Sequence, residues 1–283
     1  MNVLKARPRA IPSLGKGRKG FTELSNMKHF FIAALLCCSI SSIFAQSKKT
    51  NINIVFIGNS ITQGVQLTDP AAEAPPATAI AWLRKQGNLG TVEFSNQGHS
   101  GYTTLDFLPG TNTFAQVEQA AGAFTDKEAL LIFSMKLGTN DSAIQGPHGS
   151  PVSPADYIQN VKTITDKLLT DFPKAIIIYQ HPLWYSPNTY NGGKYLQEGL
   201  SRLQSYVPKL DSLVAAYGTT NPHHVFVGDK KGFNYFKKHH LTDLIPENGK
   251  QGTFYLHPNK QGALALGEFW GRAIEKVVRK VVK

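Results

Sequence analysis

Four residues have side chains or backbones suited to acyl-transfer chemistry, and each lies at the boundary of a predicted strand or helix. Ser60, Gly98 and Asn140 each lie where an apolar run stops, and His257 directly precedes a C-terminal amphipathic segment. A serine hydroxyl becomes a useful nucleophile when a neighbouring base accepts its proton. Histidine supplies an imidazole that titrates near neutral pH and can act as that base. The set therefore points to a serine nucleophile with a histidine base.

Acyl transfer also needs donors for the negatively charged oxygen of the tetrahedral intermediate. The backbone N–H of Ser60, the backbone N–H of Gly98 and the side-chain amide of Asn140 are three candidates, and one such donor is worth about 2.7–4 kcal/mol of barrier. A glycine at position 98 permits close approach of the backbone. Asn59, beside Ser60, is a candidate for lining the cleft.

Each residue has a simpler structural interpretation. Ser60 could be the N-cap of a helix, Asn140 with Asp141 could form an ordinary turn, and Gly98 could be a turn glycine. His257 could simply sit at a helix start. All four simple interpretations together require a coincidence of order and spacing, so we favour the functional one.

Apolar strand-like segments alternate with amphipathic helical segments along the chain. The helix 153–173 is the clearest, with Ser153 as a cap and apolar residues at three- and four-residue intervals. The C-terminal helix is predicted from Pro258, with Leu264 among its core-facing residues. The predicted strands cover 52–58, 91–98, 128–138, 174–184 and 223–229. This alternation predicts an α/β fold with a mostly parallel five-stranded sheet between two helical layers.

Parallel strands bring their carboxyl ends to one edge of the sheet, and ligands bind at that edge in open α/β sheets. The motifs that should meet there are "GNSIT", "NQGHSG", "GTND" and "LHPN". They resemble, in order, the four blocks of the SGNH hydrolase superfamily, also called GDSL-type esterases. The resemblance runs from Gly58 to His257. It implies a flavodoxin-like α/β/α fold, catalysis by Ser60 and His257, and an oxyanion hole formed by Ser60, Gly98 and Asn140.

The sequence departs from the family pattern at one position. The family places an aspartate three residues before the histidine to orient the imidazole, whereas this chain has Phe254 there. Either a Ser–His dyad operates, or an acid comes from elsewhere. Asp243 and Glu247, upstream in what we expect to be the same loop, are the nearest candidates.

Other histidines suggest neither a metal site nor a cofactor. The His-His pairs lack the helical spacing of a metal motif, and no carboxylate cluster accompanies them. His181 and Trp184, after the fourth predicted strand, are candidates for lining the cleft, with a packed aromatic loop as the alternative. The remaining histidines are expected at the surface or behind the site: His99, His148, His223, His224, His239 and His240.

The N-terminus predicts export. Residues 27–45 read as a secretory signal peptide, with Ala45 before the expected cleavage site, and residues 1–26 as a leader or a mis-assigned start. Processing at Cys37 or Cys38, as in a lipoprotein, is the alternative. Residues 1–45 hold seven Lys/Arg and one acid, so the net charge falls from +11 to +5 without them. This weakens the case for a nucleic-acid partner.

Residues 46–283 are therefore expected to form a single secreted or periplasmic hydrolase domain, without membrane insertion after signal cleavage. The predicted reaction is removal of O-acetyl or other short acyl groups from carbohydrate, such as sialic acid or a plant glycan, through an acetyl-Ser60 intermediate. The "LHPNKQG" ending resembles that of bacterial carbohydrate and sialate O-acetylesterases. The alternatives are a lysophospholipase, thioesterase or aryl esterase on the same scaffold, or a glycan-binding protein without catalysis.

Overall fold

The computed structural model describes residues 49–146 and 148–282. The predicted leader 1–26 and signal peptide 27–45, with Cys37 and Cys38, lie outside the described residues. Lys48–Lys283 forms one compact unit.

The centre of the fold is a five-stranded sheet whose strands are all parallel. The strand order is β2-β1-β3-β4-β5, the order of flavodoxin-like proteins. The predicted fold class is therefore confirmed, with each strand within the region expected from its apolar run or overlapping it. The strands are β1 (Thr50–Gly58), β2 (Leu89–Gly98), β3 (Leu130–Lys136), β4 (Ile176–Tyr179) and β5 (Val225–Val227).

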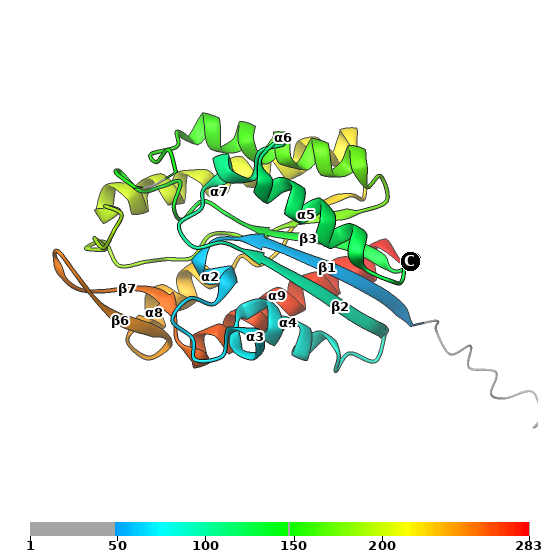
Figure 1. Cartoon of the computed structure of the whole chain (residues 1–283), viewed down its shortest axis with the longest axis horizontal. Coiled ribbons are helices and arrows are strands. Elements are labelled where there is room, and N and C mark those ends of the chain that lie inside the picture. Colours follow the sequence, from blue (N-terminus) through cyan, green and yellow to red (C-terminus); the bar gives the residue numbers. More distant parts are fainter. Residues whose placement is uncertain (1–48, 147, 283) are drawn as a thin grey trace, which may run out of the picture. The chain divides into compact units, whose positions relative to one another are not determined.

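Helices cover both faces of this sheet, which explains why the strands are almost continuously apolar. Figure 1 shows α5, α6 and α7 on one face, and α4 and α9 on the other. These helices are α4 (Pro75–Leu83), α5 (Asn112–Ala123), α6 (Pro154–Asp171), α7 (Leu196–Thr220) and α9 (Lys260–Val281).

Local sequence signals set the helix boundaries. Ser153 caps α6 as predicted, since its Oγ accepts the Asp156 N–H at 3.1 Å. The C-terminal helix begins at Lys260 rather than Pro258, because Asn259 is its cap and accepts the Gly262 N–H at 3.0 Å. The prediction that Leu264 faces the core is wrong: its side chain is 58% exposed on the outer side of α9.

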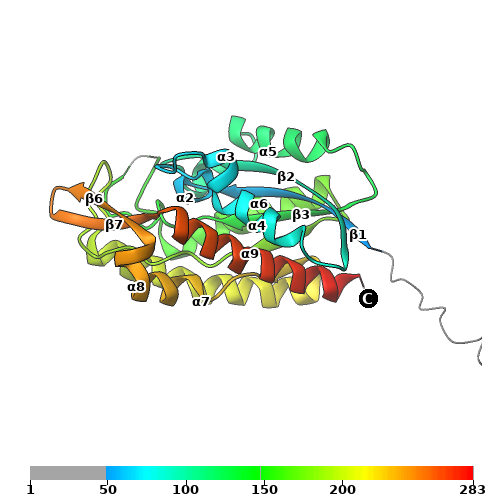
Figure 2. The same cartoon turned by 90° about the horizontal axis from the view of Figure 1, so that it is seen from below.

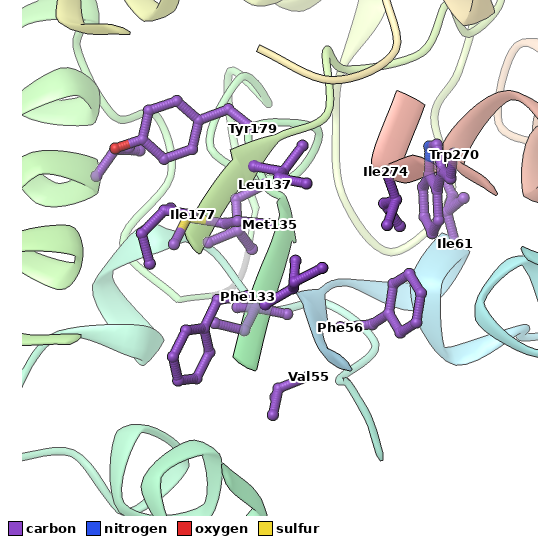
Figure 3. Packing of buried hydrophobic residues seen from close by; sticks show 14 of the residues in the cluster. Val55, Phe56, Ile61, Phe133, Met135, Leu137, Ile177, Tyr179, Trp270 and Ile274 are labelled. Carbon is purple, nitrogen blue, oxygen red and sulfur yellow. The ribbon is translucent and has the colours of Figure 1, made fainter. Parts of the chain in front are cut away.

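The core joins the first strand to the last helix. Phe56 of β1 stacks on Trp270 of α9, with ring centroids 6.0 Å apart, and both side chains are buried. Figure 3 shows Ile61 and Ile274 in the same group. This contact fixes the carboxyl end of β1 relative to α9.

The segment before α9 is ordered secondary structure and not the loop that we expected. It consists of α8 (Gly232–Asp243) followed by an antiparallel hairpin of β6 (Leu244–Gly249) and β7 (Gly252–Pro258). Figure 2 shows this hairpin leading directly into the first turn of α9. The remaining short elements are α2 (Ser60–Gln63), α3 (Pro70–Glu73) and η1 (Thr104–Phe107).

The strand order also determines where a ligand should bind. The chain leaves β1 to pair β2 on one side and β3 on the other, which makes the carboxyl ends of β1 and β3 the topological switch point of the sheet. Ser60 follows β1 and Asn140 follows β3. Both residues therefore lie at the position where this fold opens a crevice.

The Phe56–Trp270 contact generates a test of the fold. Trp270→Ala should lower the free energy of unfolding by about 3–5 kcal/mol, because it empties a fully buried aromatic site. The control on the same helix is Leu264→Ala, which should change it by less than about 0.5 kcal/mol. Urea unfolding followed by circular dichroism measures both, and equal losses for the two variants would contradict this packing.

Candidate active site

Ser60 is the first residue of α2 and not its cap. Asn59 is the N-cap, since its Oδ1 accepts the Ile61 N–H at 3.2 Å. The Ser60 hydroxyl is therefore released from the capping role, and its Oγ lies 2.9 Å from His257 Nε2. As the first helical residue, Ser60 also has a backbone N–H without an acceptor inside the helix.

Glycine at position 98 is explained by how closely β2 packs on α2. A Cβ added to Gly98 would lie 2.3 Å from the Gln63 nitrogen and 2.8 Å from the Thr62 carbonyl carbon, both of them backbone atoms of α2. Any side chain would push away the helix that begins with Ser60. Gly98 thus allows α2 to sit against the end of β2.

His257 lies on β7, one residue before that strand ends. Its side chain is 9% exposed, and its two ring nitrogens face opposite neighbours. Nε2 faces Ser60, while Nδ1 lies 2.9 Å from Glu247 Oε1. When Nε2 is the nitrogen that accepts the Ser60 proton, Nδ1 carries the ring hydrogen and donates a hydrogen bond to Glu247.

Glu247, from the opposite strand of the hairpin, is the acid that contacts this histidine. Its Oε1 also accepts the backbone N–H of His257 at 3.3 Å, and its Oε2 accepts from Gln66 Nε2 at 2.6 Å. Asp243, the other acid that we considered, ends α8 and accepts from the hydroxyls of Tyr235 and Thr242 at 2.6 and 2.7 Å. Of the two candidates, only Glu247 is placed to orient His257.

The surroundings of Glu247 favour its ionised form. Burial alone would raise the pKa of its carboxyl group, because the side chain is 11% exposed. Hydrogen bonds from His257 and Gln66, together with the charge of a protonated His257, outweigh burial and lower the pKa below its usual value. A negative charge therefore stands behind the imidazole.

Gln66 completes this arrangement and was not anticipated from the sequence. Its backbone has a φ of +70°, an uncommon conformation for a residue other than glycine. The amide nitrogen lies 3.2 Å from His257 Nδ1 as well as 2.6 Å from Glu247. Since both Nδ1–H and an amide N–H are donors, the carboxylate is the acceptor that the two share. An unusual φ leaves no signature in the sequence "VQL".

Asn140 lies in a turn held by its neighbour. Asp141 accepts from the backbone N–H groups of Thr104 at 2.8 Å and Gly138 at 3.1 Å, and from the Thr104 hydroxyl at 2.5 Å. Burial raises the pKa of Asp141 to about 6, against these hydrogen bonds. The turn role that we considered for this pair thus falls to Asp141, which leaves the Asn140 side chain for other contacts.

The three expected oxyanion donors differ in whether their N–H groups already make hydrogen bonds within the protein. Asn140 Nδ2 gives one hydrogen to the Tyr102 carbonyl at 2.8 Å, and its second hydrogen remains. The Gly98 N–H already lies 3.0 Å from Asn96 Oδ1. The Ser60 N–H and the second Asn140 N–H are therefore better placed to receive an oxyanion than the Gly98 N–H.

The residues suggested as cleft lining have other contacts. His181 lies 2.9 Å from Asp211 through Nε2, and Trp184 is buried with its ring 5.1 Å from that of His240. These contacts support the packed-loop alternative for both residues. Asn59 is fully buried and caps α2, so it does not line an open cleft either.

Neither a metal-binding cluster nor a membrane-spanning helix occurs among the described residues. Within residues 49–146 and 148–282, no group of three or more His, Cys, Asp or Glu side chains could hold a metal ion. No helix in the same residues has the length and apolar character to cross a membrane.

The sequence matches a known family over most of its length. The profile of the GDSL-like Lipase/Acylhydrolase family aligns with residues 56–265, from β1 into α9. No curated protein matches the chain by sequence.

Solved structures share the fold at low sequence identity. Est24, a carbohydrate acetylesterase from Sinorhizobium meliloti, is 15% identical, with a TM-score of 0.54 over 80% of this chain and 100% of that chain. The lipase/acylhydrolase from Enterococcus faecalis is 20% identical, with a TM-score of 0.54 over 79% and 95%. A catalytic mutant of Axe2, an acetylxylan esterase from Geobacillus stearothermophilus, is 19% identical, with a TM-score of 0.53 over 82% and 96%. These likenesses show the fold.

The lowered pKa of Glu247 predicts a pH-dependent contribution to stability. The folded-state pKa lies below 4.5, the value expected for the unfolded chain, so ionised Glu247 stabilises the fold above that pH. The contribution is lost as the pH falls through the folded-state pKa. Near neutral pH, Glu247→Gln should therefore be less stable than the wild type by about 1–3 kcal/mol.

Urea unfolding of both proteins between about pH 7 and pH 3 tests this, since the range brackets ordinary carboxyl pKa values. The difference in unfolding free energy should shrink on acidification. A difference that stays constant across this range would contradict a charged Glu247 in the folded protein.

Proposed function

Because the chain belongs to the GDSL-like Lipase/Acylhydrolase family, we propose that it is a secreted serine esterase that removes short acyl groups, acetyl above all, from carbohydrate. The observation that carries this proposal is the hydrogen-bonded chain from Ser60 through His257 to Glu247, with contacts of 2.9 Å and 2.9 Å. Secretion rests on the predicted signal peptide at 27–45.

The geometry supports a two-step reaction. Ser60 Oγ attacks the ester carbonyl carbon while its proton passes to His257 Nε2. Glu247 stabilises the imidazolium and keeps its ring in line. The oxyanion forms near the Ser60 N–H and the free Asn140 N–H. Collapse of the intermediate breaks the bond to the alcohol, which takes the proton from His257. A water molecule then repeats the sequence on the acetyl-Ser60 ester and releases acetate.

A small polar hollow lies outside the Ser60–His257–Glu247 group, on segments that connect to the site along the chain. It has a volume of about 210 Å³ and combines one aromatic ring with amide and ammonium groups. Lys194 directly precedes Tyr195, which hydrogen-bonds Asn140, and Lys250 lies at the turn of the hairpin that carries Glu247. Such groups suit sugar hydroxyls better than an acyl chain. The lining residues are Gln145, Gly146, Tyr190, Gly192, Lys194 and Lys250.

Two of the structural neighbours point the same way by analogy. Est24 is described as a carbohydrate acetylesterase and Axe2 as an acetylxylan esterase. Since an α/β scaffold hosts many activities, this analogy supports the choice of substrate but does not by itself assign one.

Acetate release tests the proposed reaction. The wild type should release acetate from O-acetylated sialoglycans or acetylated xylan, and Ser60→Ala should lower kcat by at least about 10⁴-fold, because the nucleophile is gone. Release of no acetate by the wild type from any acetyl ester would overturn the enzymatic proposal, whereas full activity of Ser60→Ala would overturn the site. Nitrophenyl esters of increasing chain length provide the comparison: a maximum at long chains would indicate a lipase or lysophospholipase instead.

The orienting acid has its own test. Glu247→Gln should lower kcat for nitrophenyl acetate by about 10²–10⁴-fold, because the charge that stabilises the imidazolium is lost. The matched control is Asp243→Asn, which removes the nearby carboxylate that accepts hydrogen bonds from Tyr235 and Thr242. The control should keep the wild-type kcat. The reverse pattern would show that Asp243, and not Glu247, serves His257.

A further inference from the structure

Asn140 is held from both ends of its amide. Its side chain is buried, with 4% exposed. Nδ2 donates to the backbone carbonyl of Tyr102, and Oδ1 accepts from the hydroxyl of Tyr195, each at 2.8 Å. One hydrogen of Nδ2 is then left, and both contacts determine where it points.

We propose that Tyr195 is a positioning residue for the oxyanion: its hydroxyl fixes the Asn140 amide and strengthens the remaining N–H as a donor. This inference rests on the proposed function, in which that N–H contacts the oxyanion. Tyr195 lies outside the four motifs from which the site was predicted.

The Tyr102 carbonyl determines which end of the Asn140 amide carries the hydrogens, and the Tyr195 hydroxyl holds the opposite end. If the Asn140 amide were reversed, Oδ1 would face the Tyr102 carbonyl oxygen, and two acceptors would meet without a hydrogen between them. Burial raises the pKa of Tyr195 to about 12, so this hydroxyl stays protonated and can donate. A hydrogen bond accepted at the carbonyl end of an amide also polarises its N–H groups. Tyr195 therefore helps to hold the donor in position and also strengthens it.

Backbone hydrogen bonds hold the segment that carries Tyr195 next to the segment that follows Asn140. Lys194, directly before Tyr195, pairs with Gln145 in both directions: its N–H donates at 2.6 Å and its carbonyl accepts at 3.2 Å. The Tyr195 N–H also donates to the Thr189 carbonyl at 3.1 Å. The segment that carries the tyrosine is thus joined to the one that follows Asn140, so the hydroxyl can be aimed without a flexible connection.

The choice of acceptor distinguishes Tyr195 from Tyr206 and Tyr157, two other buried tyrosines of the same region. Buried tyrosine hydroxyls usually need a partner, and a backbone carbonyl serves that purpose. Tyr206 donates to the Val152 carbonyl at 2.6 Å, and Tyr157 to the Leu137 carbonyl at 3.3 Å. The partner of Tyr195 is instead the side chain of a proposed oxyanion donor.

Tyr195→Phe tests the inference, since phenylalanine keeps the ring and its packing. With nitrophenyl acetate, kcat should fall about three- to tenfold while KM stays unchanged, because the lost hydrogen bond acts mainly on the transition state. The matched control is Tyr185→Phe, whose ring lies 5.4 Å from that of Tyr195. It also removes a buried hydroxyl, but Ser142 keeps its bond to the Thr139 carbonyl at 2.8 Å, so kcat should not change.

A double-mutant cycle separates positioning from a general structural effect. Asn140→Ala alone should lower kcat by about 10²–10³-fold, and adding Tyr195→Phe should then cost nothing more, because its target is gone. An equal loss from Tyr195→Phe in both backgrounds, or no loss in the wild-type background, would overturn the inference. Full activity of Asn140→Ala would instead show that the proposed oxyanion hole is wrong.

Inhibitor binding gives a readout independent of turnover. Methylboronic acid forms a tetrahedral adduct on a reactive serine, and this adduct places an oxygen where the oxyanion would lie. Tyr195→Phe should weaken methylboronic acid binding by the same three- to tenfold factor, about the value of one hydrogen bond, and leave the affinity for acetate unchanged. Equal weakening of both ligands would point to a distorted pocket and would contradict the inference.

Discussion

The hydrogen bond between Ser60 Oγ and His257 Nε2 joins residues 197 positions apart in the chain. Its 2.9 Å length requires that the end of β1 and the end of β7 keep a fixed position relative to each other, although these strands belong to different sheets. Two packing contacts achieve this. Phe56 stacks on Trp270, which ties β1 to α9, and Gly98 lets β2 lie directly on the backbone of α2. The site therefore depends on the whole core and not on a local motif.

The β6–β7 hairpin solves a problem of position. At the place three residues before the histidine, this chain has Phe254, which is 1% exposed and packs into the core. The residue paired with Phe254 across the hairpin is Glu247. From there a glutamate can reach both the ring and the backbone N–H of His257. Glu247 therefore contacts the imidazole of His257 and also accepts a hydrogen bond from the backbone of β7, the strand that carries His257.

Much of the fold could be predicted from the sequence, because the pattern of apolar residues differs between buried strands and amphipathic helices. Five apolar runs separated by amphipathic segments predict a parallel sheet covered on both faces, and the observed sheet has that form. The hairpin at 244–258 escaped because β6, "LIPENG", has no continuous apolar run and is only partly buried. The signal that could have found it is the turn-forming stretch "NGKQG", in which β6 ends and β7 begins. Leu264 was misplaced because hydrophobicity alone does not tell which face of α9 meets the sheet.

At the site, residue types and their order were enough to select Ser60, Asn140 and His257 as candidates, because acyl transfer requires those groups and a parallel sheet collects strand ends at one edge. The linear pattern could not choose between Asp243 and Glu247, which lie four positions apart. Only the pairing of β6 with β7 turns Glu247 toward His257, while Asp243 meets Tyr235. Gln66 and Tyr195 were equally inaccessible to sequence reasoning, because their contacts depend on a positive φ in one case and on a 55-residue separation in the other. Contacts of this kind exist only once the chain has folded.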